Sequence, residues 1–526
     1  MAAAGLPERA RAPRLNGQVI PEPSPSLCAA LAADLDAAGY TSARLRALWG
    51  VVADEALGRG RALPVRRALA RVDDAAATLA RLFWLGDPVS SGELERALPR
   101  CGVAGLVGLG LAREDAAGIV PLAVVRPQAF VDEAGAGEWW IASDLDEVAL
   151  GGPIAPDHVL GVGGASMTLA GLQLPVPADR VLDLGTGCGI QALRARRAAG
   201  AVVATDISEP ALRFARLNAL LNDVPGVQTR HGSLFEPVRG ESFDRIVSNP
   251  PFVITPRATG VPAYEYRDGG LEGDDLVRAV VTGAGAHLAP GGTAQMLGNW
   301  EYRDGEDGLE RVREWVALSP VPLDAWVIER ERLDPVAYAE LWIRDGGTVP
   351  GSAGYDTLLS AWLDDFAARG VDEIGFGYIL LRRPREGRPT LARYERVAQP
   401  VAERALGAHL AACLEAHARQ HAVDDDGLAA SVLQVADDVT EARHHLPGAA
   451  DPSVIELRQG GGFSRTIPVD PALAALVGAC DGELPIGRLI DAIAQLMEVD
   501  AAALREDLLP RVRALLDDGL LHFAGS

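Results

Sequence analysis

The sequence predicts an α/β protein in which a mostly parallel sheet is flanked by helical modules at both ends. Three observations support this prediction. The length of 526 residues corresponds to several domains of about 150 residues each. Short apolar runs alternate with helical stretches in the middle of the chain, which is typical of βαβ units, whereas apolar residues recur at helical spacing near both ends. We expect a flexible tail (1–25), an N-terminal helical domain (26–130), an α/β domain (131–395) and a C-terminal helical domain (396–526).

The composition is that of a globular protein, with 48% hydrophobic and 23% charged residues. The formal charge is −23, and all 49 basic side chains are arginines. An acidic chain is a poor candidate for sequence-independent binding of nucleic acid, although a local arginine-rich face is compatible with it. The five cysteines are far apart, and the chain starts without a signal-peptide pattern. We therefore expect a cytoplasmic protein without a membrane span.

Both terminal modules have the segment order of a winged helix. In the first, Ser90 or Ser91 is placed to cap a helix, a second helix follows in VAGLVGLGLAR, and the apolar run GIVPLAVV predicts a small β ribbon. The last 60 residues repeat this order loosely, from DPALAALVGAC to LREDLLPRVRALLDDGLLHF. Winged helices bind nucleic acid or serve as protein contacts, and the acidic DDG and EVD segments here favour protein contacts.

The strongest motif is VLDLGTGCGIQAL, at Val181 to Leu193. An apolar strand leads directly into a glycine-rich turn and a helix, which brings the backbone close to a ligand at the carboxyl end of the strand. Gly185, Gly187 and Gly189 are the positions at which we expect a Cβ atom to block that approach. Taken alone, this spacing suits a dinucleotide equally well.

Two later strand ends favour S-adenosylmethionine over a dinucleotide. AVVATD ends in Asp206, 23 residues after Asp183, where a carboxylate can accept hydrogen bonds from both ribose hydroxyls. FDRIVSNPPFV then places Asn249, Pro250, Pro251 and Phe252 after a fourth strand. A planar amide or aryl amine is a poor nucleophile because its lone pair is delocalised. An Asn249 oxygen and a Pro250 carbonyl that accept its two N–H groups would localise the lone pair, while the prolines fix the loop and Phe252 offers a stacking face.

The stretch from Val181 to Gly292 resembles class I S-adenosylmethionine-dependent N-methyltransferases of the NPP[FY] group. It is similar both to HemK-like glutamine methyltransferases and to ribosomal RNA guanine methyltransferases. The resemblance implies a Rossmann-like core with a mostly parallel seven-stranded sheet. It also implies the following sites: Asp183, Gly185, Thr186, Gly187 and Gly189 around the methionine part of the cofactor, Asp206 on the ribose, Ile207 and Ser208 beside the adenine, Gly232, Ser233 and Leu234 along the adenine edge, and Asn249 to Phe252 at the acceptor. Ser233 departs from the Asp that is common in the family.

The acceptor class stays open at this stage. A protein glutamine-type amide is favoured, because the chain is acidic and its motifs are HemK-like. An exocyclic amine of an RNA or DNA base is the alternative, and a natural-product methyltransferase or a non-catalytic binding regulator is the second alternative. Residues Tyr264 to Arg267 are either part of the acceptor pocket or an exposed loop.

No metal site is expected, because His231 and the pair His444 and His445 lack partners at metal-ligand spacing. Cys188 is interpreted as a small residue that fills the glycine-rich loop and not as a nucleophile.

Overall fold

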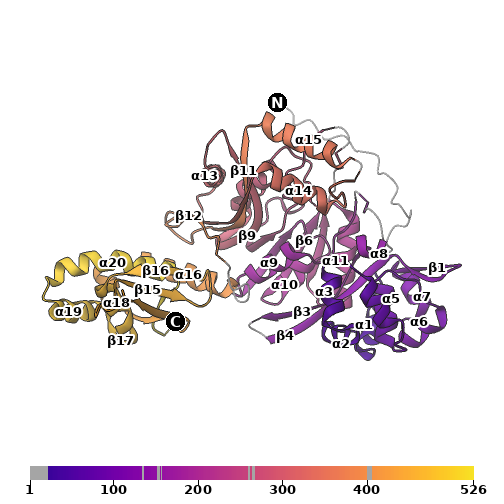
Figure 1. Ribbon diagram of the computed structural model, residues 1–526, viewed down its shortest axis with the longest axis horizontal. Coiled ribbons are helices and arrows are strands. Elements are labelled where there is room, and N and C mark those ends of the chain that lie inside the picture. The colour runs from indigo at the N-terminus through magenta and orange to yellow at the C-terminus, as the bar shows by residue number, and fades with distance from the viewer. Residues whose placement is uncertain are drawn as a thin grey trace.

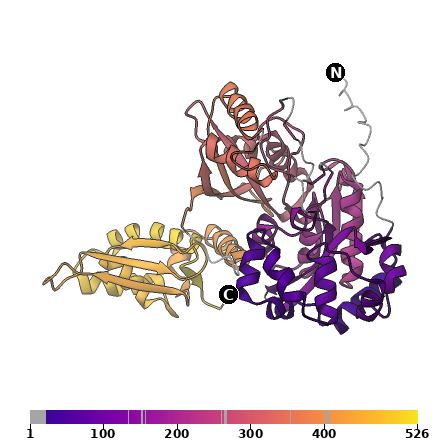
Figure 2. The ribbon, with the colours of Figure 1, turned by 45° about the vertical axis from the view of Figure 1, so that its right-hand side comes forward.

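The computed structural model describes residues 22–132, 135–150, 154–155, 157–258, 261–262, 267–352, 354–399 and 406–525. The expected tail up to residue 21 and Tyr264 to Tyr266 therefore lie outside the described residues. A central sheet carries the N-terminal helices on one side, and the C-terminal part extends away from it as an arm (Figures 1 and 2).

Within the described residues the central sheet has eight strands, in the order β12-β10-β11-β9-β8-β5-β6-β7. The strands from β5 to β9 are mutually parallel, β11 is antiparallel to both of its neighbours, and β12 is parallel to β10. The expected number of seven is wrong because β12 is added at the edge. Asp324, at the start of β10, holds this segment by accepting the N–H groups of Thr390 and Leu391 at 2.7 and 2.9 Å. The strands are β5 Ala178–Leu184, β6 Ala199–Asp206, β7 Val227–His231, β8 Phe243–Ser248, β9 Leu288–Arg303, β10 Asp324–Leu333, β11 Val371–Arg382 and β12 Ala392–Arg396.

Helices cover both faces of this sheet, because alternate side chains of each strand are apolar toward opposite faces. On β9, Met296 packs among the side chains of α12 and α13, whereas the next residue, Leu297, packs among those of α9 and α16. Two further helices, α14 and α15, are inserted between β10 and β11. The helices are α9 Gly164–Leu172, α10 Ile190–Arg196, α11 Glu209–Leu221, α12 Asp275–Ala284, α13 Gly308–Ala317, α14 Pro335–Asp345, α15 Tyr355–Ala368 and α16 Leu406–His421.

The N-terminal part packs directly on α11. Asn218 of α11, and Asn222 directly after this helix, bond through their side chains to the backbone of Ala142 and Trp140 in the hairpin β3–β4. The predicted helix start after Ser90 is confirmed, with a capping box to Glu93. The elements are α1 Pro25–Ala37, α2 Ser42–Trp49, α3 Val51–Gly58, α4 Leu63–Leu69, α5 Ala75–Phe83, α6 Ser91–Ala97, α7 Gly102–Gly108, β1 Ala112–Asp115, β2 Gly118–Pro121, β3 Ala123–Asp132, β4 Gly135–Asp144 and α8 Glu147–Leu150.

The C-terminal part has more strands than the small ribbon of the expected winged-helix-like module. It contains the three-stranded sheets β14-β15-β16 and β17-β13-β18 beside its helices. Most of these strands were not predicted because they are short, and VTEARH of β14 is also largely exposed. The elements are α17 Asp425–Ala429, β13 Val432–Val435, β14 Val439–His444, β15 Val454–Gln459, β16 Thr466–Val469, α18 Pro471–Ala479, β17 Asp481–Pro485, α19 Ile486–Met497, α20 Ala501–Asp517 and β18 Leu521–Phe523.

Candidate functional site

The glycine-rich loop after β5 adopts a conformation that favours glycine. Gly185, Gly187 and Gly189 have φ values of +73°, +55° and +90°. A Cβ atom at Gly185 or Gly187 would meet no protein atom within 4 Å, whereas one at Gly189 would lie 3.0 Å from the Ala215 backbone in α11. Gly189 is therefore packed against α11. The other two glycines border open space.

Two carboxylates flank this loop. Asp183, at the end of β5, is fully buried, and its Oδ2 accepts the Thr186 hydroxyl at 2.5 Å while Oδ1 has no partner among the described residues. Burial raises the pKa of Asp183 to about 7. Asp206, at the end of β6, accepts the N–H groups of Gly187 and Ser208 at 2.9 and 2.8 Å. Burial also raises the pKa of Asp206, against these two hydrogen bonds.

The predicted adenine edge lies beside Asp206. The N–H of Gly232 donates to the Asp206 carbonyl at 3.0 Å, and the His231 ring bonds to the Ile207 carbonyl at 2.8 Å. Ile207 is 64% exposed although it is apolar, and Leu234 holds a left-handed φ of +47°. Ser208 and Ser233, also assigned to this edge, are partly exposed. The structure thus brings these loop residues to the same strand ends as the glycine-rich loop.

The NPPF segment follows β8 at the same edge of the sheet. The Asn249 Oδ1 atom is buried and has no hydrogen-bond partner among the described residues. Pro250 is buried and Pro251 is partly exposed. Phe252 is half-buried and contacts the Trp342 ring edge-on, with 6.4 Å between ring centroids. An unpaired buried acceptor is costly, so Asn249 presents an atom that is suited to an N–H donor from outside the protein.

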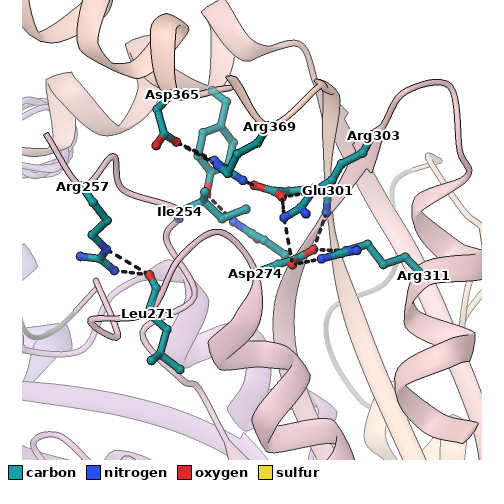
Figure 3. A network of polar contacts seen from close by, with 11 residues as sticks. Ile254, Arg257, Leu271, Asp274, Glu301, Arg303, Arg311, Asp365 and Arg369 are labelled. Carbon is teal, nitrogen blue, oxygen red and sulfur yellow. Dashed lines mark hydrogen bonds and ion pairs between the residues drawn. The ribbon is translucent and has the colours of Figure 1, made fainter. Parts of the chain in front are cut away.

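A network of buried carboxylates and their arginine partners lies close to Ile254, two residues after this segment (Figure 3). The Asp274 carboxylate, at the start of α12, accepts two hydrogen bonds from Arg311 at 2.7 Å and the Glu301 N–H at 3.0 Å. The buried Glu301 side chain pairs with Arg303 and Arg369. Burial and the nearby Asp274 raise the pKa of Glu301. Sequence reasoning missed this network, because its members are far apart in the chain.

The remaining candidates lie elsewhere or are inert. Cys188 is buried, and burial raises the pKa of its thiol to about 11, which agrees with a filling role. His444 pairs with Glu456 on the exposed face of β14. The described part of the chain contains no group of three or more His, Cys, Asp or Glu that could hold a metal ion. It also contains no helix with the length and apolar character needed to cross a membrane.

Three family models match the chain. Residues 163–312 match the methyltransferase small domain, which includes the glycine-rich loop, Asp206 and the NPPF segment. Residues 37–122 and 414–523 match two different domains of unknown function. Trp342 and Arg369, which contact Phe252 and Glu301, lie beyond the central match.

Curated relatives agree with this match. The release factor glutamine methyltransferase of Xylella fastidiosa is 40% identical over 131 residues, which are 23% of this chain and 47% of that protein. The ribosomal protein uL3 glutamine methyltransferase of Bradyrhizobium diazoefficiens is 35% identical over 151 residues, which are 27% of this chain and 46% of that protein. The chain thus spans about half the length of the curated relatives it matches.

Solved methyltransferase structures also match at low identity. One is a 16S rRNA N2 G1207 methyltransferase of T. thermophilus in complex with AdoMet and guanosine, at 22% identity. The match covers 50% of this chain and 66% of that one, with a TM-score of 0.27.

Proposed function

From the premise that residues 163–312 are an S-adenosylmethionine-dependent methyltransferase domain, we propose that the protein methylates the side-chain amide of a glutamine in another protein. The observation that carries the proposal is the buried, unpaired Oδ1 of Asn249 in an NPPF segment of such a domain. The relatives at 40% and 35% identity are glutamine methyltransferases, which supports an amide as the methyl acceptor.

The residues present suit the cofactor. The open space beside Gly185 and Gly187 leaves room for a ligand against the loop, and the unpaired Asp183 Oδ1 is an acceptor for a cationic amino group. Asp206 keeps its carboxylate at the end of β6, where ribose hydroxyls are bound in such folds. Bound there, S-adenosylmethionine supplies an electrophilic methyl group.

The protein's contribution is to hold and polarise the acceptor nitrogen. Asn249 Oδ1 accepts one N–H of the amide and the Pro250 carbonyl accepts the other, which localises the nitrogen lone pair. Phe252 provides a flat apolar face for the planar amide. Positioning of this kind contributes most of the acceleration in a transfer that needs no strong base. The amide nitrogen forms an N–CH3 bond as the S–CH3 bond of the sulfonium breaks. The electron pair of that bond stays on the sulfur of S-adenosylhomocysteine, and the nitrogen releases one proton.

The charges beside the NPPF segment favour a protein acceptor over a nucleic acid. A base methyltransferase would need unpaired cations near Asn249 to hold phosphates. Arg257 pairs with Asp268 at 2.6 Å, and Arg267 pairs with Asp345 at 2.8 Å, so both arginines are already neutralised.

We assign the terminal modules, predicted to be winged-helix-like, to contacts with the acceptor protein.

The test is transfer of methyl from labelled S-adenosylmethionine to an intact peptide-chain release factor, followed by mass spectrometry of the labelled peptide. The proposal expects one methyl on a glutamine amide and a loss of at least 100-fold in rate with Asn249→Ala. The matched control is Asn222→Ala at the C-terminal end of α11, which lies outside the NPPF segment and is expected to change the rate less than threefold. Label on RNA instead would favour the base methyltransferase. Retention of activity in Asn249→Ala to within a few fold would refute the mechanism.

A further inference from the structure

The helical insertion between β10 and β11 reaches the NPPF segment through one side chain. Tyr338 of α14 is fully buried. Its hydroxyl oxygen accepts the backbone N–H of Ile254 at 3.0 Å and the Nδ2–H of Asn299, on β9, at 2.7 Å. Ile254 lies two residues after Phe252. The hydroxyl therefore joins the insertion, the sheet and the chain that leaves the NPPF segment.

Apolar packing also holds the residues that follow the NPPF segment. Val253 and Ile254 belong to one buried cluster with Tyr338, and this cluster includes side chains from both α14 and α15. Phe252 lies at its edge, against Trp342. On its other side, the segment is held by the Val253 N–H, which donates to the Arg267 carbonyl at 2.8 Å, and by the bridge of Phe252 to Asp268. The backbone after the two prolines is thus fixed from two directions.

We propose that the α14–α15 insertion braces the NPPF segment and that Tyr338 is the positioning residue of this brace. This inference rests on the proposed function, because its effect on rate acts through Asn249 and Pro250. Removal of the hydroxyl leaves the Ile254 N–H and the Asn299 amide without this acceptor at a buried position. The segment then shifts to find other partners, which displaces Asn249 Oδ1 and the Pro250 carbonyl from the acceptor nitrogen. A displacement of about 1 Å at a reacting centre can cost 100-fold in rate.

The insertion also contains a matched control. Tyr355, at the start of α15, is 5% exposed and belongs to the same buried cluster, but its hydroxyl has no hydrogen-bond partner among the described residues. Tyr338→Phe and Tyr355→Phe therefore remove the same atom from the same cluster. Only the first removes contacts to Ile254 and Asn299.

The test measures the brace in two independent ways. Hydrogen–deuterium exchange of the full-length protein reports on the Ile254 N–H and needs no methyl-acceptor protein. We expect its exchange to be at least tenfold faster in Tyr338→Phe and unchanged in Tyr355→Phe. With S-adenosylmethionine and the release factor, kcat should fall by 10- to 100-fold in Tyr338→Phe, while the Kd of the cofactor stays within twofold. If Tyr338→Phe does not fold, Asn299→Ser removes one of the two contacts and should give a smaller increase of exchange at Ile254.

Equal exchange at Ile254 in the two tyrosine variants would overturn the proposal, and so would an unchanged kcat in Tyr338→Phe. If the wild-type protein methylates no release factor while the exchange arm behaves as expected, the brace stands and only the proposed acceptor fails.

Discussion

Cofactor binding should depend on pH through Asp183. Burial raises the pKa of this carboxyl to about 7, so the group changes its charge near neutrality. With that pKa, about one tenth of the molecules carry the carboxylate at pH 6 and about nine tenths at pH 8. If the carboxylate binds the cationic amino group of S-adenosylmethionine, affinity should rise about tenfold between these pH values.

The assay is isothermal titration of S-adenosylmethionine into the wild-type protein and into Asp183→Asn at both pH values. At each pH, the Kd of Asp183→Asn is divided by the Kd of the wild-type protein. Changes of Kd that come from titration of the ligand or of Asp206 cancel in this ratio, because both proteins share them. We expect this ratio to change about tenfold from pH 6 to pH 8. A ratio that is constant to within twofold would refute the role of Asp183 as the cation's partner.

Three further predictions concern stability and the loop. Folding raises the pKa of Asp183 from 3.8 to about 7 and so favours its neutral form. The free energy of unfolding should therefore fall by about 4 kcal/mol as the pH rises from about 4 to 7. Urea titrations of Asp183→Asn should show no such fall. Asp274→Ala should lower the free energy of unfolding by about 3 kcal/mol, because it leaves Arg311 without its bidentate partner. The neighbouring Asp275→Ala breaks an exposed pair with Arg278 and should lower it by less than about 1 kcal/mol. Equal losses in the two variants would contradict the role of burial. Gly187→Ala and Gly240→Ala both place a non-glycine residue at a positive φ, so each should lower the free energy of unfolding by about 1–2 kcal/mol. Only Gly187→Ala should weaken cofactor binding measured by titration. Equal binding by the two variants would argue against a ligand beside Gly187.

The sequence predicted the parts of the site that are local in the chain. The glycine-rich loop, Asp206 and the NPPF segment each follow an apolar strand directly, and parallel strands bring their carboxyl ends to one edge of a sheet. The capping box at Ser90 is likewise a contact over three residues. Such signals need no knowledge of the tertiary structure.

Contacts between distant residues could not be predicted in this way. Tyr338 bonds to a residue 84 positions earlier, and Asp274 bonds to one 37 positions later. Neither pair has a spacing or a residue type that distinguishes it in one sequence. β12 and β14 were missed for a different reason. Their side chains are half-exposed or exposed, so the apolar alternation that marks a half-buried strand is weak.

β12 divides its side chains between two neighbours, as a strand must. Arg393 and Glu395 face the C-terminal arm, where they pair with Asp518 and Arg465, while Arg396 on the opposite face pairs with Asp307. The strand also covers β10, which would otherwise end the sheet with unpaired N–H and C=O groups. A shortened protein that stops before Ala392 would expose that edge to intermolecular strand pairing, and it should aggregate although every residue of the methyltransferase small domain is retained. Loss of β12 would also remove the residues through which the sheet pairs with the C-terminal arm.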